Sequence, residues 1–273
     1  MIRYANAPKE MREFKVNGTV EDLYSYPIKG LSAQPLEAVS LIAGEGFPLD
    51  RAYGFALPKS GFNPDNPKPL PKTKFVMLAR EETLALLDTN FDSETGTLSI
   101  NADRQSASFD ITTQAGRTSA SRFLSDCLGI SPELQPTLHS AKPHRFTDVS
   151  VVSPAMMNAV SLINLDSVAY LSEQIGHSVE PARFRGNILF SGFAPFSELD
   201  LVGKRIAVGD VQLKVVLRTK RCPATQVNPN SGKRDLDIPK LLQEHFGHSD
   251  MGVYAEVECS GTLRRGAELR LIG

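Results

Sequence analysis

Short segments rich in β-branched and aromatic residues, separated by glycine and proline, most restrict the folds open to this chain. In the first half these segments are Thr19–Pro27, Leu36–Ile42, Arg51–Leu57, Lys74–Leu78, Leu98–Ile100 and Ala107–Ile111. In the second half they are Asn187–Phe190, Lys204–Val208, Val211–Arg218, Val253–Cys259 and Glu268–Ile272. Many short strands joined by turn residues are typical of barrels and sandwiches.

A smaller number of segments show helical spacing of apolar residues. They are Arg80–Leu87, Ser121–Leu128, Ser153–Leu162, Leu165–Ile175 and Leu236–Phe246. The third opens with a serine followed by proline, a common helix start. We therefore predict an α+β protein that is mostly β, built on barrel-like sheets with a few interposed helices. A change of composition at Ser131–His144 predicts two units, residues 16–140 and 141–273.

Composition and charge exclude several classes of protein. The 273 residues carry 30 Lys and Arg against 31 Asp and Glu, and this balance argues against a nucleic-acid partner. Three cysteines are too few for a disulfide scaffold and fit a reducing compartment. The first 18 residues lack the apolar core of a secretory signal, and no apolar run approaches the ~18 residues of a membrane span. We expect a cytoplasmic protein without a membrane partner.

The common sequence signatures of nucleotide-binding folds, zinc proteases and α/β-hydrolases are missing. The three cysteines, by contrast, can be told apart. Cys127 lies on an apolar helix face, and Cys259 shares an alternating apolar face with Val253, Ala255 and Val257. Both are expected to be small core residues.

Cys222 has different surroundings. It ends the run Arg218-Thr219-Lys220-Arg221-Cys222, where a strand enters a turn containing proline and three cations crowd one thiol. Positive charge favours the thiolate, the form that acts as a nucleophile or a metal ligand. Spacing alone leaves two interpretations open, a functional thiol or a turn cysteine beside a solvated basic cluster.

The turn that follows favours an anion site. Residues 228–232, Asn-Pro-Asn-Ser-Gly, can present hydroxyl and backbone N–H donors beside the thiol. No His or Asp close to Cys222 in the sequence suggests a triad partner, which disfavours a cysteine hydrolase.

Residues 221–232, beginning Arg-Cys-Pro-Ala-Thr, resemble the cysteine motif of the MOSC family, named for the C-terminal domain of molybdenum cofactor sulfurase. Residues 26–30 (Tyr-Pro-Ile-Lys-Gly) and 49–51 (Leu-Asp-Arg) resemble the β-barrel domain that precedes it in that family. Asp148, Ser153, residues 183–187 (Arg-Phe-Arg-Gly-Asn) and residues 261–266 fall in the expected order. The units 16–140 and 141–273 would then be the MOSC N-terminal domain and the MOSC domain.

The resemblance implies a molybdenum–molybdopterin cofactor, because related amidoxime-reducing components carry one and reduce N-hydroxylated compounds. By position, Cys222 would be the catalytic cysteine and molybdenum ligand. Further contacts to the anionic cofactor would come from basic residues, hydrogen-bonding residues and a helix start: Lys29, Arg51, Arg185 and Arg221; Asn187 and Thr225; and Ser153. Asp50 would orient the Arg51 guanidinium. Three cysteines leave no iron–sulfur extension, so electrons would come from a separate ferredoxin-like or flavoprotein-like partner.

The chain also departs from the reductases at four positions. Asn228 replaces an acidic residue, Gly186 a proline, Lys220 a small residue and Gly30 a serine. A reductase of hydroxylamine- or amidoxime-like substrates is the leading hypothesis. The alternative is a carrier that holds sulfur or the finished cofactor at Cys222 without turnover. An RNA- or protein-binding β-barrel is disfavoured by the near-neutral charge.

Overall fold

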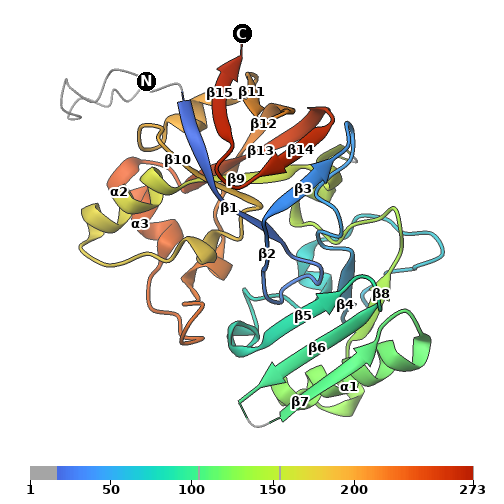
Figure 1. Cartoon of the computed structure of the whole chain (residues 1–273). Coiled ribbons are helices and arrows are strands. Elements are labelled where there is room, and N and C mark those ends of the chain that lie inside the picture. The colour runs from blue at the N-terminus through green and yellow to red at the C-terminus, as the bar shows by residue number, and fades with distance from the viewer. Residues whose placement is uncertain (1–16, 104, 154, 273) are drawn as a thin grey trace.

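The computed structural model describes residues 17–103, 105–153 and 155–272 (Figure 1). Within them, seven strands form a closed barrel, and three α-helices are present. The barrel strands follow the order β10 (Ile188–Ser191), β9 (Val160–Asn164), β13 (Asp250–Cys259), β12 (Val211–Lys220), β11 (Arg205–Val208), β15 (Glu268–Ile272) and β1 (Asn17–Ser25). Pairing of β1 with β10 closes the barrel. The predicted mostly-β class with barrel-like sheets is confirmed.

Alternation along the strands builds the barrel core. On β12, Val211, Leu213 and Val215 are buried and the residues between them are not, so one face of the strand points inward. Their neighbours Val257 and Ala255 on β13 are buried in the same hydrophobic cluster. Apolar side chains from neighbouring strands therefore fill the interior, as expected for a small barrel.

One parallel pair interrupts the otherwise antiparallel barrel. β9 pairs with β10 in parallel, and α2 (Leu165–Ile175) makes the crossover between them. The Asn164 side chain caps this helix by accepting from Asp166 N, and Gly176 ends it with a left-handed φ of 67°. α3 (Ile238–Phe246) lies beside α2 on the outside of the barrel (Figure 1).

Two short strands from the N-terminal part join the barrel region. β2 (Gln34–Leu36) extends the sheet from β1, and β3 (Ala38–Leu41) pairs with β14 (Gly261–Arg264) near the end of the chain. The predicted single strand Leu36–Ile42 is thus divided between two sheets. Because β1 and β2 belong to the barrel sheet, the two predicted units share one sheet.

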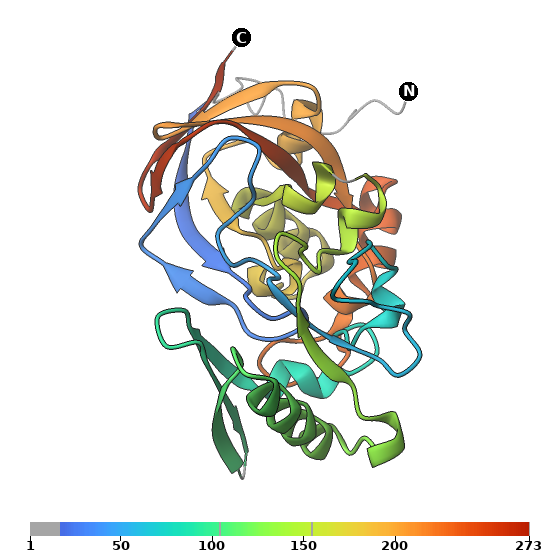
Figure 2. The ribbon, with the colours of Figure 1, turned by 90° about the vertical axis from the view of Figure 1, so that its right-hand side faces the viewer.

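A smaller layered unit lies below the barrel in Figure 1. β5 (Asp88–Asp92), β6 (Thr97–Ala102) and β7 (Gln105–Asp110) form an antiparallel sheet, and α1 (Gln114–Leu128) packs against it. A two-stranded sheet of β4 (Tyr53–Ala56) and β8 (Thr137–Ser140) adjoins this unit. The view turned by 90° shows loops running between the barrel and the small unit below it (Figure 2).

The structure corrects three expectations about local structure. Ser153–Leu162 is not a helix, since a 3-10 turn at Ala155–Asn158 leads into strand β9. Lys74–Leu78 is not a strand, because Phe75 makes a single bridge to Ala56 after the 3-10 turn Lys72–Lys74. Arg80–Leu87 contains a 3-10 turn at Glu82–Leu86.

One of the two cysteine predictions also needs correction. Cys259 is exposed rather than part of the core, whereas Cys127 is half-buried and packs against the core of the small unit. The cause for Cys259 is a shift in register, since Gln212 pairs with Cys259 while Leu213 pairs with Val257. This β-bulge moves Cys259 off the buried face that Val257 shares.

Among the described helices, none has both the length and the apolar character required to span a bilayer.

Candidate functional site

A cavity of about 430 Å³ lies where loops of both units meet the end of β12. From the N-terminal part, its walls come from the loop after β1, the loop before β4 and the turn Lys72–Lys74. From the rest of the chain they come from residues 146–149, residues 183–187, the end of β12 with the cysteine turn, and β13. Segments far apart in the sequence thus converge on one hollow. Loops on a rigid scaffold are where binding sites commonly lie.

The charge of the cavity lining is strongly positive. Eight of the described lining residues are basic: Lys29, Arg51, Lys72, Arg183, Arg185, Arg218, Lys220 and Arg221. Two are acidic, Asp50 and Asp148. A cleft lined by one sign of charge attracts ligands of the opposite sign. The formal net charge of -1 for the whole chain therefore conceals a local excess of basic residues.

Cys222 lies in this lining, half-buried and two residues after the end of β12. Pro223 begins a 3-10 turn, Pro223–Gln226, and Cys222 is the residue directly before this turn. Thr225 donates from both its N–H and its hydroxyl to the Cys222 carbonyl, at 3.0 and 2.9 Å. Thr225 therefore holds the cysteine turn in shape, and its hydroxyl is already engaged within the protein.

Arg221 is anchored by the backbone on both sides. Its guanidinium donates to the carbonyl oxygens of Met251 and Phe184, at 2.8 and 2.9 Å, and lies over the Phe184 ring at 5.2 Å. Burial lowers the pKa of Arg221 to about 10, which leaves the group charged at neutral pH. The adjacent Cys222 thus sits beside a permanent, immobilised cation.

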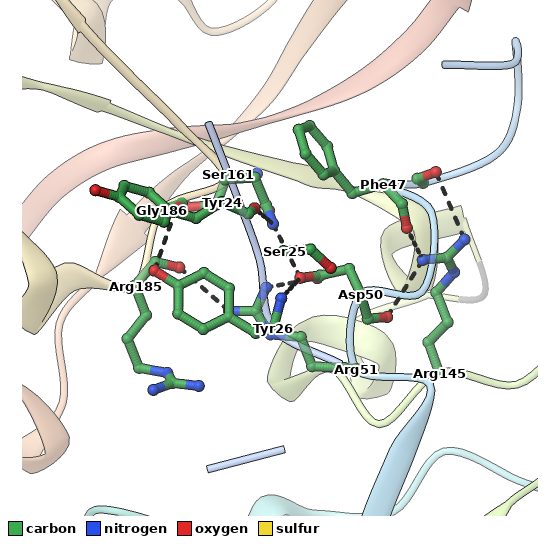
Figure 3. Close-up of polar contacts among 12 residues, drawn as sticks. Tyr24, Ser25, Tyr26, Phe47, Asp50, Arg51, Arg145, Ser161, Arg185 and Gly186 are labelled. Carbon is green, nitrogen blue, oxygen red and sulfur yellow. Dashed lines mark hydrogen bonds and ion pairs between the residues drawn. The ribbon is translucent and has the colours of Figure 1, made fainter. Parts of the chain in front are cut away.

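Arg51 and Arg185 form a pair over one aromatic ring (Figure 3). Their guanidinium carbons lie 4.3 and 4.4 Å from the centre of the Tyr26 ring, close enough for cation–π attraction. Arg51 donates to the Arg185 carbonyl at 3.2 Å, and Arg185 donates to the Leu31 carbonyl at 2.8 Å. Both arginines have left-handed backbones, with φ of 49° and 51°. Such strained residues concentrate at functional sites.

Asp50 and Asn187 fix the position of Arg51 beside the Tyr26 ring. The Asp50 carboxylate is buried, pairs with Arg51, and accepts from Tyr26 N at 2.9 Å and from Asn187 Nδ2 at 3.0 Å. The Asn187 amide also donates to the Tyr24 carbonyl and accepts from Ser161 N, both at 3.1 Å. The expected orientation of Arg51 by Asp50 is confirmed. Asn187 lines the cavity, but its amide is occupied by protein partners.

Lys29 and Lys72 meet at a second corner of the cavity. Lys29 is buried, donates to the Phe146 carbonyl at 2.9 Å and pairs with Asp148. Lys72 Nζ lies 3.6 Å from Asp148 Oδ2 and faces the Cys222 thiol. Burial alone would lower the pKa of Lys72, but the thiol and the carboxylate outweigh it and raise the pKa. One carboxylate thus bridges two ammonium groups close to the cysteine.

Sequence reasoning missed several residues of this lining, among them Lys72 and Tyr254. Lys72 directly follows the proline-rich segment Pro58–Pro71, and a long loop in a compact protein often borders a site. That segment was the available signal. Tyr254 lies on β13, where burial raises the pKa of its hydroxyl. No local pattern distinguishes it from other strand residues.

Ser153 is the predicted site residue that the structure does not bring to the cavity. Its hydroxyl accepts from Met156 N at 3.3 Å, so it caps a short 3-10 turn instead. A turn of this length presents no extended helix start to a phosphate. Pro154, the other half of the predicted helix start, lies outside the described residues.

The described residues include no group of three or more His, Cys, Asp or Glu side chains arranged to hold a metal ion. A metal that arrives within a larger organic cofactor needs fewer protein ligands, and one thiolate can suffice. Two buried hydroxyls in the lining, Thr147 Oγ1 and Thr219 Oγ1, have no hydrogen-bond partner in the described protein. A soft sulfur, surplus cations and unpaired hydroxyls together fit an anionic, thiophilic metal cofactor.

Two family patterns match this chain. The MOSC N-terminal beta barrel domain matches residues 17–130, and the MOSC domain matches residues 142–270. The chain therefore belongs to the proteins that join a MOSC N-terminal β-barrel domain to a MOSC domain. The resemblance seen in the cysteine motif is confirmed.

Known relatives extend the similarity over nearly the whole chain. Mitochondrial amidoxime-reducing component 1 of Mus musculus is 24% identical, across 97% of this chain and 86% of the relative. Mitochondrial amidoxime reducing component 2 of Bos taurus is also 24% identical, across 95% and 84%. Molybdenum cofactor sulfurase of Caenorhabditis elegans is 32% identical over 34% of this chain and 13% of its own length. The chain is thus a distant full-length homologue of the amidoxime-reducing components.

Proposed function

We propose that this protein binds a molybdenum–pterin cofactor through Cys222 and reduces N-hydroxylated compounds with electrons from a separate redox protein. The observation that carries the proposal is the excess of eight basic over two acidic residues around one half-buried thiol. The relatives whose names describe amidoxime reduction support the choice of substrate class.

Some residues of the cavity would bind the cofactor directly, and others would supply positive charge from fixed positions. Cys222 would supply the sulfur ligand, and Lys72 and Lys220 would offer ammonium groups to the anionic part of the cofactor. Arg51, Arg185 and Arg221 would contribute fixed positive charge, since their guanidinium groups are already anchored to carbonyl oxygens. When bound, such a cofactor supplies two-electron oxygen-atom transfer.

Reduction of an N–OH group consumes two electrons and two protons and yields N–H and water. We infer that the electrons come from a separate protein, since three cysteines are too few for an iron–sulfur centre of four cysteine ligands. A ferredoxin-like or flavoprotein-like donor would fill that role. The cavity opens beside Lys220 and Arg218 at the end of β12, which are exposed.

The test is metal and pterin analysis followed by turnover. Protein from a host that makes the cofactor should contain about one molybdenum per chain, and Cys222→Ser should lose most of it. Wild-type protein should reduce benzamidoxime with a chemical donor. Cys259→Ser, a change at an exposed cysteine that does not line the cavity, should match wild type.

Metal-free wild-type protein from a competent host would contradict the proposal. Bound cofactor, or sulfane sulfur on Cys222, without any turnover would instead indicate a carrier.

A further inference from the structure

Thr219 carries a hydroxyl that the protein leaves without a partner. The side chain is 4% exposed and lines the cavity. Among the described residues, three buried side-chain polar atoms have no hydrogen-bond partner: Thr147 Oγ1, Thr219 Oγ1 and His248 Nε2. Two of the three belong to this one cavity. Unpaired buried polar atoms are uncommon in folded proteins, so their meeting in one site needs an explanation.

Thr219 lies opposite a bulge in β13. Arg218 pairs with Val253 and Lys220 pairs with Asp250, so two residues of β13, Met251 and Gly252, face Thr219 alone. Bulges re-aim side chains and are frequent beside active sites. Thr219 is the last residue but one of β12 and comes three residues before Cys222, close to the segment that brings Arg221 to the cavity.

Thr225 shows that a neighbouring threonine can be satisfied within the protein. Its hydroxyl, in the same lining, donates to the Cys222 carbonyl at 2.9 Å. A buried hydroxyl without a partner opposes folding, whereas a paired one does not. Both are buried threonines close to Cys222, but the Thr225 hydroxyl is already hydrogen-bonded and the Thr219 hydroxyl is available to a ligand.

We propose that Thr219 is a ligand-contacting residue whose hydroxyl donates a hydrogen bond to an oxyanion of the bound ligand. The cations around it fix the sign of the ligand's charge, and a hydrogen bond to a charged oxygen is stronger than a neutral one. Thr147 offers a second hydroxyl from the segment that carries Asp148. The identity of the ligand as a molybdenum–pterin cofactor rests on the proposed function; the oxyanion contact does not.

The test compares Thr219→Val, Thr219→Ser and the control Thr225→Val. Thr219→Val removes the hydroxyl and keeps the shape, so cofactor-free protein should keep its Tm or gain up to about 2 °C. Thr225→Val breaks a made hydrogen bond and should lower the Tm. In protein from a cofactor-making host, Thr219→Val should retain about tenfold less molybdenum, and Thr219→Ser should retain nearly the wild-type amount.

Two results would overturn the role of Thr219: molybdenum retention by Thr219→Val equal to wild type, or a Tm loss as large as that of Thr225→Val. Wild-type protein without metal would overturn the proposed function instead. The oxyanion contact is then measured by calorimetry with orthophosphate and cofactor-free protein. About tenfold weaker binding by Thr219→Val would support it, and equal binding, or no binding by wild type, would overturn it.

Discussion

Asn187 donates a 3.0 Å hydrogen bond to the Asp50 carboxylate, joining residues 137 positions apart, and the same carboxylate pairs with Arg51. The barrel strand β10 begins at Ile188, so Asn187 ties the barrel to the loop that carries the site arginine. Asp50 and Asn187 are thus the means by which the fold fixes a cation in the cavity. They are positioning residues for Arg51.

Asn187→Ala should lower the free energy of unfolding by about 2–4 kcal/mol. The substitution removes three hydrogen bonds and leaves the buried Ser161 N–H and Asp50 each short of a partner. Urea denaturation measures the loss. Asn101→Ala is the matched control, since its amide makes one exposed 3.4 Å contact with Asp88, and it should change stability by less than about 0.5 kcal/mol. Equal effects of the two variants would contradict the positioning role.

Gly252→Ala should be much more disruptive than Gly266→Ala. Both glycines have left-handed backbones, with φ of 76° and 77°. A Cβ at residue 252 would lie 2.3 Å from the Leu162 carbonyl and 3.3 Å from Arg221 Nη2, whereas at residue 266 it would meet nothing within 4 Å.

Gly266→Ala should therefore cost about 1–2 kcal/mol from its backbone alone, and Gly252→Ala at least about 2 kcal/mol more. Denaturation curves give the difference. Gly252→Ala should also lose molybdenum, because Arg221 must move. Matching stabilities for the two variants would show that no close contact exists at residue 252.

Lys72→Met should reduce the bound cofactor about tenfold, because it removes an ammonium group that faces Cys222 and bridges to Asp148. Lys74→Met, two residues away in the same turn and exposed, should leave cofactor content unchanged. Molybdenum content and the fluorescence of oxidised pterin measure both. If the two variants retain equal amounts, Lys72 has no particular part in holding the cofactor.

Much of the cysteine side of the site could be predicted from sequence because its residues are contiguous. β12 ends at Lys220 and Arg221-Cys222-Pro223 follow it directly, so a cation and a thiol arrive together whatever the rest of the fold does. Lys72 could not be assigned, since only the tertiary fold brings the end of the proline-rich segment to the cysteine. Thr219 likewise has no local signature, because the absence of a partner is a property of its surroundings.

The strand β9 shows why part of the fold escaped prediction. All five residues of Val160–Asn164 are buried, so the segment lacks the alternation that identifies a half-buried strand. A short run that is buried on both faces cannot be distinguished from a buried helix by periodicity. The preceding Ser153 does cap a turn, but the turn ends at Asn158 and a strand follows. Cys259 was misplaced for a related reason, since a bulge changes the phase of alternation.

Glu198 should make the stability of the protein depend on pH. Its carboxyl group is fully buried, and burial raises the pKa to about 7 although the Ser167 hydroxyl and Asn164 amide donate hydrogen bonds to it. The unfolded chain gives up this proton near pH 4.5, whereas the folded protein keeps it to about pH 7. The folded state therefore binds more protons between these values, and stability contributed by Glu198 falls as pH rises through that window.

The expected loss from pH 4.5 to 7 is about 3 kcal/mol, with no further change above pH 7 from this group. Glu198→Gln keeps the shape and cannot ionise, so it isolates the contribution of one carboxyl group from all other titrations. Unfolding free energies of wild type and Glu198→Gln, measured from pH 5 to 8, should converge toward low pH and separate as pH rises, with the variant becoming relatively more stable. Parallel curves across this range would mean that Glu198 ionises at its ordinary pKa, and that Ser167 and Asn164 compensate fully for its burial.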